Sequence, residues 1–160
     1  GVHRTWLDPS GTGKALIDTP RRAMGQLLGH AVRFGSADNV IAAGEGIETM
    51  LSLRMVLPTM PMVAALSAVH LAAIVFPAAL QRLYIARDDD SAGDGAVKTL
   101  IDRATGAGIE PITLSPCFGD FNEDLRTFGI DELSARLRVQ IAAADVARFM
   151  QLSAVAANGD

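Results

Sequence analysis

From residue 39 onwards, short apolar runs alternate with longer stretches in which apolar residues recur at helical spacing. The apolar runs lie at residues 40–43, 62–66, 83–86 and 111–114. This alternation is typical of βαβ units, which build a parallel sheet. The sequence therefore predicts an α/β fold with a parallel four-stranded sheet and helices on both faces.

Turn-forming residues organise the chain before this core. The cluster at residues 8–13 separates residues 2–7 from residues 15–18, and it predicts an opening β-hairpin. Beyond the hairpin we expect a short helix over residues 21–28 and a short strand over residues 31–34. The opening segment is thus expected to be mainly β-structure.

Helices are expected after the first and third apolar runs, and two more are expected besides the short helix over residues 21–28. An alanine-rich helix is predicted over residues 71–80, where Pro77 would kink or split it. A polar loop through Asp120 and Asn122 follows the last run, and a helical stretch is expected over residues 130–155. We therefore divide the chain into a β-rich preface packed on the core, the core, and a helical extension, at residues 1–36, 37–129 and 130–160.

Acidic residues follow three of the four apolar runs. They are Glu45 and Glu48 after the first run, Asp88, Asp89 and Asp90 after the third, and Asp120, Glu123 and Asp124 after the fourth. The carboxyl ends of parallel strands meet at one edge of a sheet, where ligands bind, so we expect these carboxylates to gather in one crevice. Two like charges about 4 Å apart repel by about 1 kcal/mol in water and about 4 kcal/mol at an effective dielectric of 20. Such a cluster favours a bound cation.

Mg²⁺ suits this cluster because it prefers hard oxygen ligands, takes one or two protein carboxylates, and keeps water and substrate phosphate as its other ligands. The spacing of Asp88 and Asp90 can place both side chains on one side of a turn, and Glu45 can act across the crevice as general base or acid. Each cluster alone also fits a structural role, with Asp90 as a helix N-cap and Glu45 in a surface turn. The coincidence of three clusters at three strand ends favours the metal site.

Charge is distributed unevenly along the chain, whose net charge is −4. Residues 1–35 hold five basic and two acidic residues. This basic front segment can hold phosphates directly, whereas the acidic body would bind a polyanion through divalent cations. On charge alone we predict contacts with a nucleic-acid template or a triphosphate for Lys14, Arg21, Arg22 and Arg33; ordinary surface scatter is the alternative.

Nothing in the sequence predicts a membrane segment, since the longest apolar runs are too short to cross a bilayer. The single cysteine, Cys117, cannot form an intramolecular disulfide, which favours a reducing compartment and a cytoplasmic location. The chain opens with neither a leader pattern nor a methionine, so we expect it to be a piece of a longer protein.

Four short motifs together resemble a known family. They are Gly44-Glu45-Gly46-Ile47-Glu48-Thr49, Ala65-Leu66-Ser67-Ala68, Ile85-Ala86-Arg87-Asp88-Asp89-Asp90-Ser91-Ala92-Gly93 and Asp120-Phe121-Asn122-Glu123-Asp124-Leu125. Over about residues 2–129, the chain resembles the toprim domain of phage and plasmid primases and primase-helicases together with the stretch that precedes this domain in them. This resemblance implies a toprim-like, Rossmann-like fold and metal-dependent nucleotidyl or phosphoryl transfer on nucleic acid. In its most specific form, it implies a DNA primase that makes an RNA primer on single-stranded DNA.

The resemblance also implies roles for individual residues. Glu45 matches the acid/base glutamate of the family, Asp88 and Asp90 match its metal-binding aspartates, and Glu48 and Asp120 fall at further acidic positions of the metal site. The implied cofactor is Mg²⁺ or Mn²⁺. The implied partners are a single-stranded DNA template, nucleoside triphosphates, and a replicative helicase or fused helicase domain. A toprim-type metal-dependent nuclease and a non-catalytic nucleic-acid-binding or interaction module are the alternatives.

Overall fold

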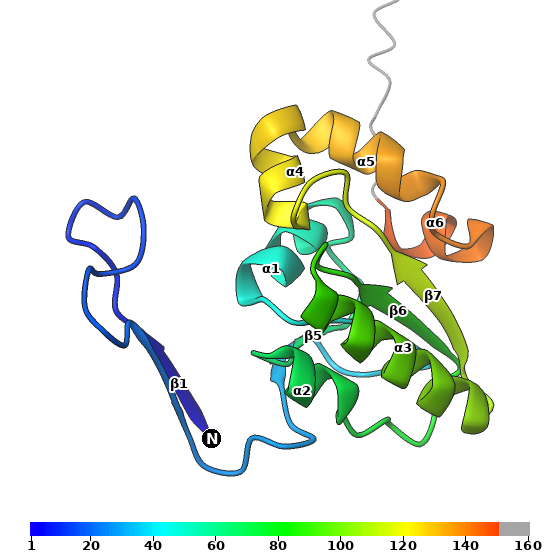
Figure 1. The fold of residues 1–160 in the computed structure, drawn as a ribbon. Coiled ribbons are helices and arrows are strands. Elements are labelled where there is room, and N and C mark those ends of the chain that lie inside the picture. Colours follow the sequence, from blue (N-terminus) through cyan, green and yellow to red (C-terminus); the bar gives the residue numbers. More distant parts are fainter. Residues whose placement is uncertain (151–160) are drawn as a thin grey trace, which may run out of the picture.

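A five-stranded sheet forms the centre of the protein in this computed structural model, which describes residues 1–150 (Figure 1). The strands lie in the order β3 (Val32–Phe34), β5 (Met62–Ala64), β4 (Val40–Gly44), β6 (Arg82–Ala86) and β7 (Glu110–Leu114). The four strands predicted from the apolar runs are present and pair in parallel, which confirms the predicted α/β fold. β3 adds an antiparallel edge strand beside β5, so part of the preface joins the sheet of the core.

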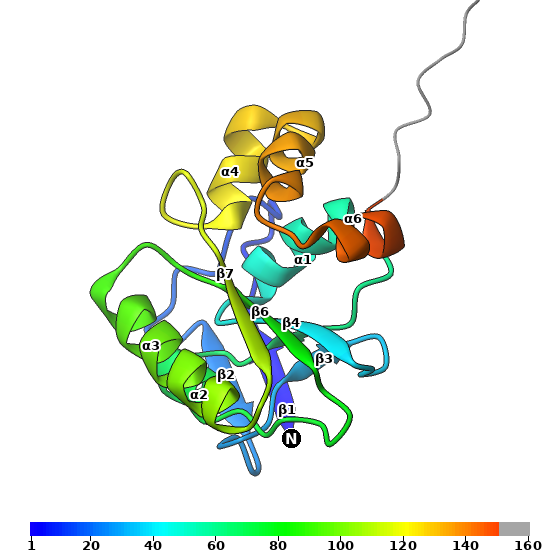
Figure 2. The same ribbon diagram turned by 90° about the vertical axis from the view of Figure 1, so that its right-hand side faces the viewer.

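Helices cover both faces of this sheet (Figure 2). On one side of the sheet in Figure 2 lie α1 (Ile47–Val56), α4 (Phe121–Phe128), α5 (Ile130–Arg138) and α6 (Ala143–Phe149). On the other side lie α2 (Ala68–Ala72) and α3 (Ser91–Gly106). Within the part of the chain that the structure describes, no helix has the length and apolar character to cross a membrane.

Alternate residues of the central strands belong to two separate hydrophobic cores, because successive side chains of a strand point to opposite faces of the sheet. Ala42 and Tyr84 belong to the core beneath α1, α4, α5 and α6. Their neighbours Ile41, Leu83 and Ile85 belong to the core beneath α2 and α3. Burial on both faces explains why these strands appear in the sequence as unbroken apolar runs.

The opening hairpin differs from its prediction. β1 (Val2–Thr5) pairs with β2 (Arg21–Met24), and Figure 1 shows this hairpin standing apart from the sheet. The predicted partner strand at residues 15–18 is wrong, since no strand forms there. Next to it, Leu7 and Lys14 form an isolated bridge, and the Ala15 N–H donates to the Trp6 carbonyl at 2.9 Å. The predicted helix over residues 21–28 is also wrong, because backbone pairing with β1 overrides the local helical pattern.

Two helical predictions also need correction. The helix predicted over residues 71–80 begins earlier, at Ala68, because the Ser67 side chain caps it by accepting a hydrogen bond from the His70 N–H at 3.3 Å. It ends at Ala72, before Pro77, which lacks an N–H to continue it. The predicted polar loop after β7 contains helix α4. The predicted helical stretch over residues 130–155 is present as α5 and α6 up to Phe149; its end lies outside the described residues.

Candidate functional site

A cleft of about 620 Å³ lies where the acidic strand ends meet the opening segment. Its volume is in the range of about 300–1,000 Å³ that small-molecule sites occupy. Most of the predicted site residues line it, namely Glu45, Glu48, Asp88, Asp120, Lys14 and Arg21. The carboxylates come from α1 and from the loops after β4, β6 and β7, whereas the cations come from the opening segment. The cleft therefore combines an acidic group of side chains with a basic one.

Glu45 follows β4 directly and is held by its backbone. Its carbonyl accepts a hydrogen bond from the Leu66 N–H at 2.8 Å. The preceding residue, Gly44, allows close packing, since a Cβ there would lie 2.5 Å from the Met50 sulfur. Burial, followed by the nearby charge of Asp90, raises the pKa of Glu45 above its ordinary value. A carboxyl group with a raised pKa is suited to take up and release a proton.

Asp88 is the most perturbed carboxylate of the cleft. Its Oδ1 atom is buried and has no hydrogen-bond partner among the described residues. Burial first, and then the charges of Glu45, Asp120 and Asp90, raise the pKa of Asp88 to about 6, although the Thr49 side chain opposes the shift. A buried acceptor without a donor is costly, which makes this atom a candidate for ligand binding.

Asp90 and Asp120 each cap a helix. The Asp90 carboxylate accepts a hydrogen bond from the Gly93 N–H at 2.7 Å and begins α3. The Asp120 carboxylate accepts one from the Glu123 N–H at 2.7 Å and begins α4. Asp120 also lines the cleft, but Asp90 does not. The structure thus shows the capping role for Asp90, whose part in metal binding stays a prediction.

Glu48 forms an ion pair with Arg21 and thereby links α1 to β2. Burial would raise the pKa of Glu48, but a backbone hydrogen bond and the charge of Arg21 outweigh it, so the pKa is lowered. The Arg21 side chain is 42% exposed and the Glu48 side chain is 47% exposed. An exposed pair of this kind contributes little to stability, so either partner can be exchanged for a ligand.

The four predicted phosphate-binding cations occupy different places. Lys14 and Arg21 line the cleft. Arg22 lies on the exposed hairpin with its Cα opposite that of Arg4. Arg33, on edge strand β3, borders a separate small cavity among apolar residues. The structure therefore brings two of the four to the acidic residues, and nucleic-acid contact by the other two stays a prediction.

Sequence reasoning missed the role of Asp124. This side chain is only 1% exposed and accepts hydrogen bonds from the Cys117 N–H at 2.9 Å and the Phe118 N–H at 3.0 Å. It closes the loop that carries Asp120. The only sequence signal is its position four residues after Asp120, in the first turn of α4.

The acidic residues fit a divalent cation in part. The unpartnered Oδ1 of Asp88 lies within electrostatic range of the Glu45 and Asp120 carboxylates, and a cation would relieve their repulsion. Among residues 1–150, however, no group of three or more His, Cys, Asp or Glu side chains is arranged to hold a metal ion by itself. Mg²⁺ needs only one or two protein carboxylates when water and phosphate supply its other ligands, so this arrangement suits it.

A family model of the toprim domain matches residues 40–131. This match covers more than half of the chain, and the chain belongs to the toprim domain family. The matched region runs from β4 into α5 and includes all the acidic residues of the cleft. A second model, for a domain of unknown function (DUF7146), matches residues 1–34.

Two solved primase structures are similar to this chain. They are a DNA primase domain from Pseudomonas aeruginosa and the zinc-binding and RNA polymerase domains of the Aquifex aeolicus primase. Each is 22% identical to this chain, has a TM-score of 0.47, and covers 64% of it. The chain spans 33% of the first and 26% of the second. No curated protein matches it.

Proposed function

We propose that this chain is the catalytic toprim domain of a DNA primase, which joins nucleoside triphosphates into an RNA primer on single-stranded DNA. Membership of the toprim family supports nucleotidyl transfer on nucleic acid. The cleft supports it further, since carboxylates and cations lie around one space. The observation that carries the proposal is the buried, unpartnered Oδ1 of Asp88.

Asp88 and Asp120 would hold a Mg²⁺ or Mn²⁺ ion, since both line the cleft. Asp90 and Glu48 are further candidate ligands. Asp90 and Asp120 each cap a helix through Oδ1 and would bind the ion through Oδ2, whereas Glu48 would first have to exchange Arg21. When bound, the ion would neutralise the cluster and polarise the phosphates of a nucleotide.

The chain's own residues bind and orient the substrate in this proposal. Lys14 and Arg21 bind phosphate oxygens in the cleft. A primer 3′-hydroxyl attacks the α-phosphorus, the bond to pyrophosphate breaks, and the Glu45 carboxylate accepts the hydroxyl proton. Arg22 and Arg33 contact the template strand outside the cleft. A helicase partner stays a prediction from the sequence.

Primer synthesis with labelled nucleoside triphosphates on single-stranded DNA tests this proposal, with Mg²⁺ or Mn²⁺ present. Asp88→Asn and Glu45→Gln are expected to lower the rate at least about 100-fold, the size of one acid/base contribution. Asp89→Asn is the matched control, because Asp89 is exposed, pairs with Arg87, and does not line the cleft. It should retain the activity.

The other outcomes separate the alternatives. Cleavage of the DNA without synthesis, if lost in Asp88→Asn, would identify a metal-dependent nuclease. Absence of both activities together with absence of Mn²⁺ binding would favour a non-catalytic module. Synthesis that is unchanged in Asp88→Asn would overturn the proposed site.

A further inference from the structure

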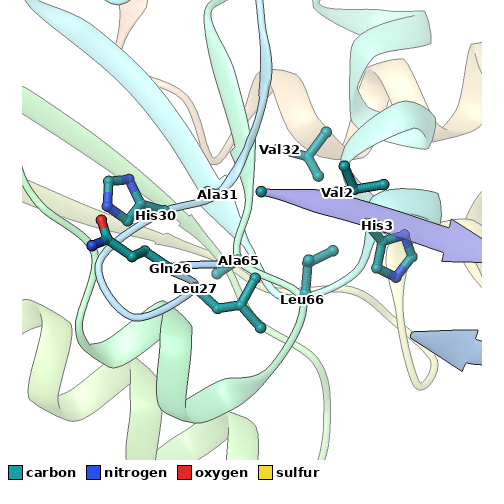
Figure 3. A pocket seen from close by; sticks show the side chains of 10 residues that line it. Val2, His3, Gln26, Leu27, His30, Ala31, Val32, Ala65 and Leu66 are labelled. Carbon is teal, nitrogen blue, oxygen red and sulfur yellow. The ribbon is translucent and has the colours of Figure 1, made fainter. Parts of the chain in front are cut away.

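A second cavity, of about 440 Å³, lies between the opening segment and the edge of the sheet. Figure 3 shows apolar side chains around its middle, contributed by Val2, Leu27, Val32 and Leu66. These residues come from β1, from the loop after β2, from β3 and from the loop after β5. Its volume is in the range of about 300–1,000 Å³ that small-molecule sites occupy.

Polar side chains lie at the ends of this cavity. Figure 3 shows Gln26 and His30 together at one end, and His3 at the other. The loop with Gln26 and His30 is tied to the core, since the Val75 N–H donates to the Gly29 carbonyl at 3.2 Å. This wall of the cavity is thus held in place by backbone contacts.

The cavity adjoins the acidic cleft. His3 and Leu66 line both spaces, and the Leu66 N–H donates to the Glu45 carbonyl at 2.8 Å. Leu66 has φ +76°, and among residues 1–150 it is the only residue other than glycine with a positive φ. Strained backbone persists where the surrounding structure enforces it, and it often marks functional sites. Here it fixes a residue that lies between the two spaces.

We infer that this cavity binds a nucleobase whose phosphates lie in the acidic cleft, an inference that rests on the proposed function. A nucleobase is flat, with apolar faces and hydrogen-bonding edges. The faces fit the apolar middle of the cavity, and the edges fit the Gln26 amide, which offers both donors and an acceptor, and the histidine at the far end. The base can come from a mononucleotide or from a nucleic-acid strand, and both sources present the same chemistry.

Calorimetric binding in the presence of Mg²⁺ tests this inference by comparing ATP with inorganic tripolyphosphate. ATP should bind at least about tenfold more tightly, since burial of the faces of the base against apolar side chains contributes that much. Leu27→Trp fills the cavity and should remove most of this difference, while the affinity for tripolyphosphate stays unchanged. The matched control is Leu28→Trp, because Leu28 is 66% exposed and does not line the cavity. Gln26→Trp, on an exposed loop position, provides a second blocking variant if Leu27→Trp unfolds.

A short single-stranded oligodeoxynucleotide distinguishes the two sources of the base. If Leu27→Trp weakens binding of the oligonucleotide and not of ATP, the cavity holds a base of the strand, and the inference stands. Equal affinity of the wild type for ATP and tripolyphosphate, together with an oligonucleotide affinity that Leu27→Trp does not change, would overturn the inference alone. Absence of any Mg²⁺-dependent binding of tripolyphosphate, ATP or oligonucleotide would overturn the proposed function and the inference with it.

Discussion

Replacing Asp88 by asparagine is expected to stabilise the metal-free protein at pH 8. Burial and neighbouring carboxylates raise the pKa of Asp88 from 3.8 to about 6. Its contribution to stability is therefore complete below pH 3.8 and is lost as the pH rises through about 6. A shift of about two pKa units corresponds to at most about 3 kcal/mol, and solvent screening of this half-buried group reduces that value. Because the asparagine oxygen stays unpartnered, we expect a net gain of about 1–2 kcal/mol in the free energy of unfolding.

Urea unfolding in the presence of a chelator measures this difference at pH 8 and at pH 5. The gain of Asp88→Asn should shrink at pH 5, where the folded wild type carries a protonated Asp88. Asp89→Asn, the exposed control, should change the stability by less than about 0.5 kcal/mol at either pH. If Asp88→Asn is less stable than the wild type at pH 8, or if its effect does not depend on pH, the reasoning about this buried carboxylate is refuted.

Three other substitutions test separate contacts. Tyr84→Phe removes a buried hydroxyl that donates to Asp145 at 2.7 Å, so urea unfolding at pH 7 should show a loss of about 1–3 kcal/mol. Burial raises the pKa of Tyr84, so the contribution of its hydroxyl to folding stability is complete below pH 10.0 and is lost at higher pH. If Tyr84→Phe lost as much stability as the wild type on going to alkaline pH, this explanation would be contradicted. Gly44→Ala would place a Cβ 2.5 Å from the Met50 sulfur and should lower the stability by about 1–3 kcal/mol in thermal unfolding, whereas no change would show that the packing adjusts. Arg21→Ala should lower the stability by less than about 1 kcal/mol but weaken Mg²⁺-dependent tripolyphosphate binding in calorimetry; unchanged binding would exclude this phosphate contact.

The parallel strands could be predicted because burial determines their composition. Both faces of β4 and β6 are covered by helices, so Val40–Gly44 and Arg82–Ala86 are almost entirely buried and apolar. The hairpin partner could not be predicted in the same way. Its strand pairing is set by backbone contacts between distant residues, such as the 2.9 Å hydrogen bond from the Trp6 N–H to the Pro20 carbonyl, which leave no apolar pattern in the sequence.

The sequence predicted which loops form the candidate site, but not the contacts of each side chain in them. The convergence of strand ends indicated Glu45, Asp88 and Asp120, and all three line the cleft. The sequence offered Asp90 as a helix N-cap, which the structure shows, but it did not indicate that the Asp88 Oδ1 atom would be buried without a partner. The ion pair of Glu48 with Arg21 could not be predicted either, since Arg21 lies 27 residues away on a strand that the sequence did not predict.

Mn²⁺ binding to the wild type, Asp88→Asn and Asp89→Asn at pH 8 is the most direct test of the claim that the cleft is a metal site. Electron paramagnetic resonance follows the free ion during a titration and needs neither template nor nucleotide. We expect the wild type and Asp89→Asn to bind alike, and Asp88→Asn to bind at least about tenfold more weakly. Equal binding by all three proteins, or no binding by the wild type, would contradict the account.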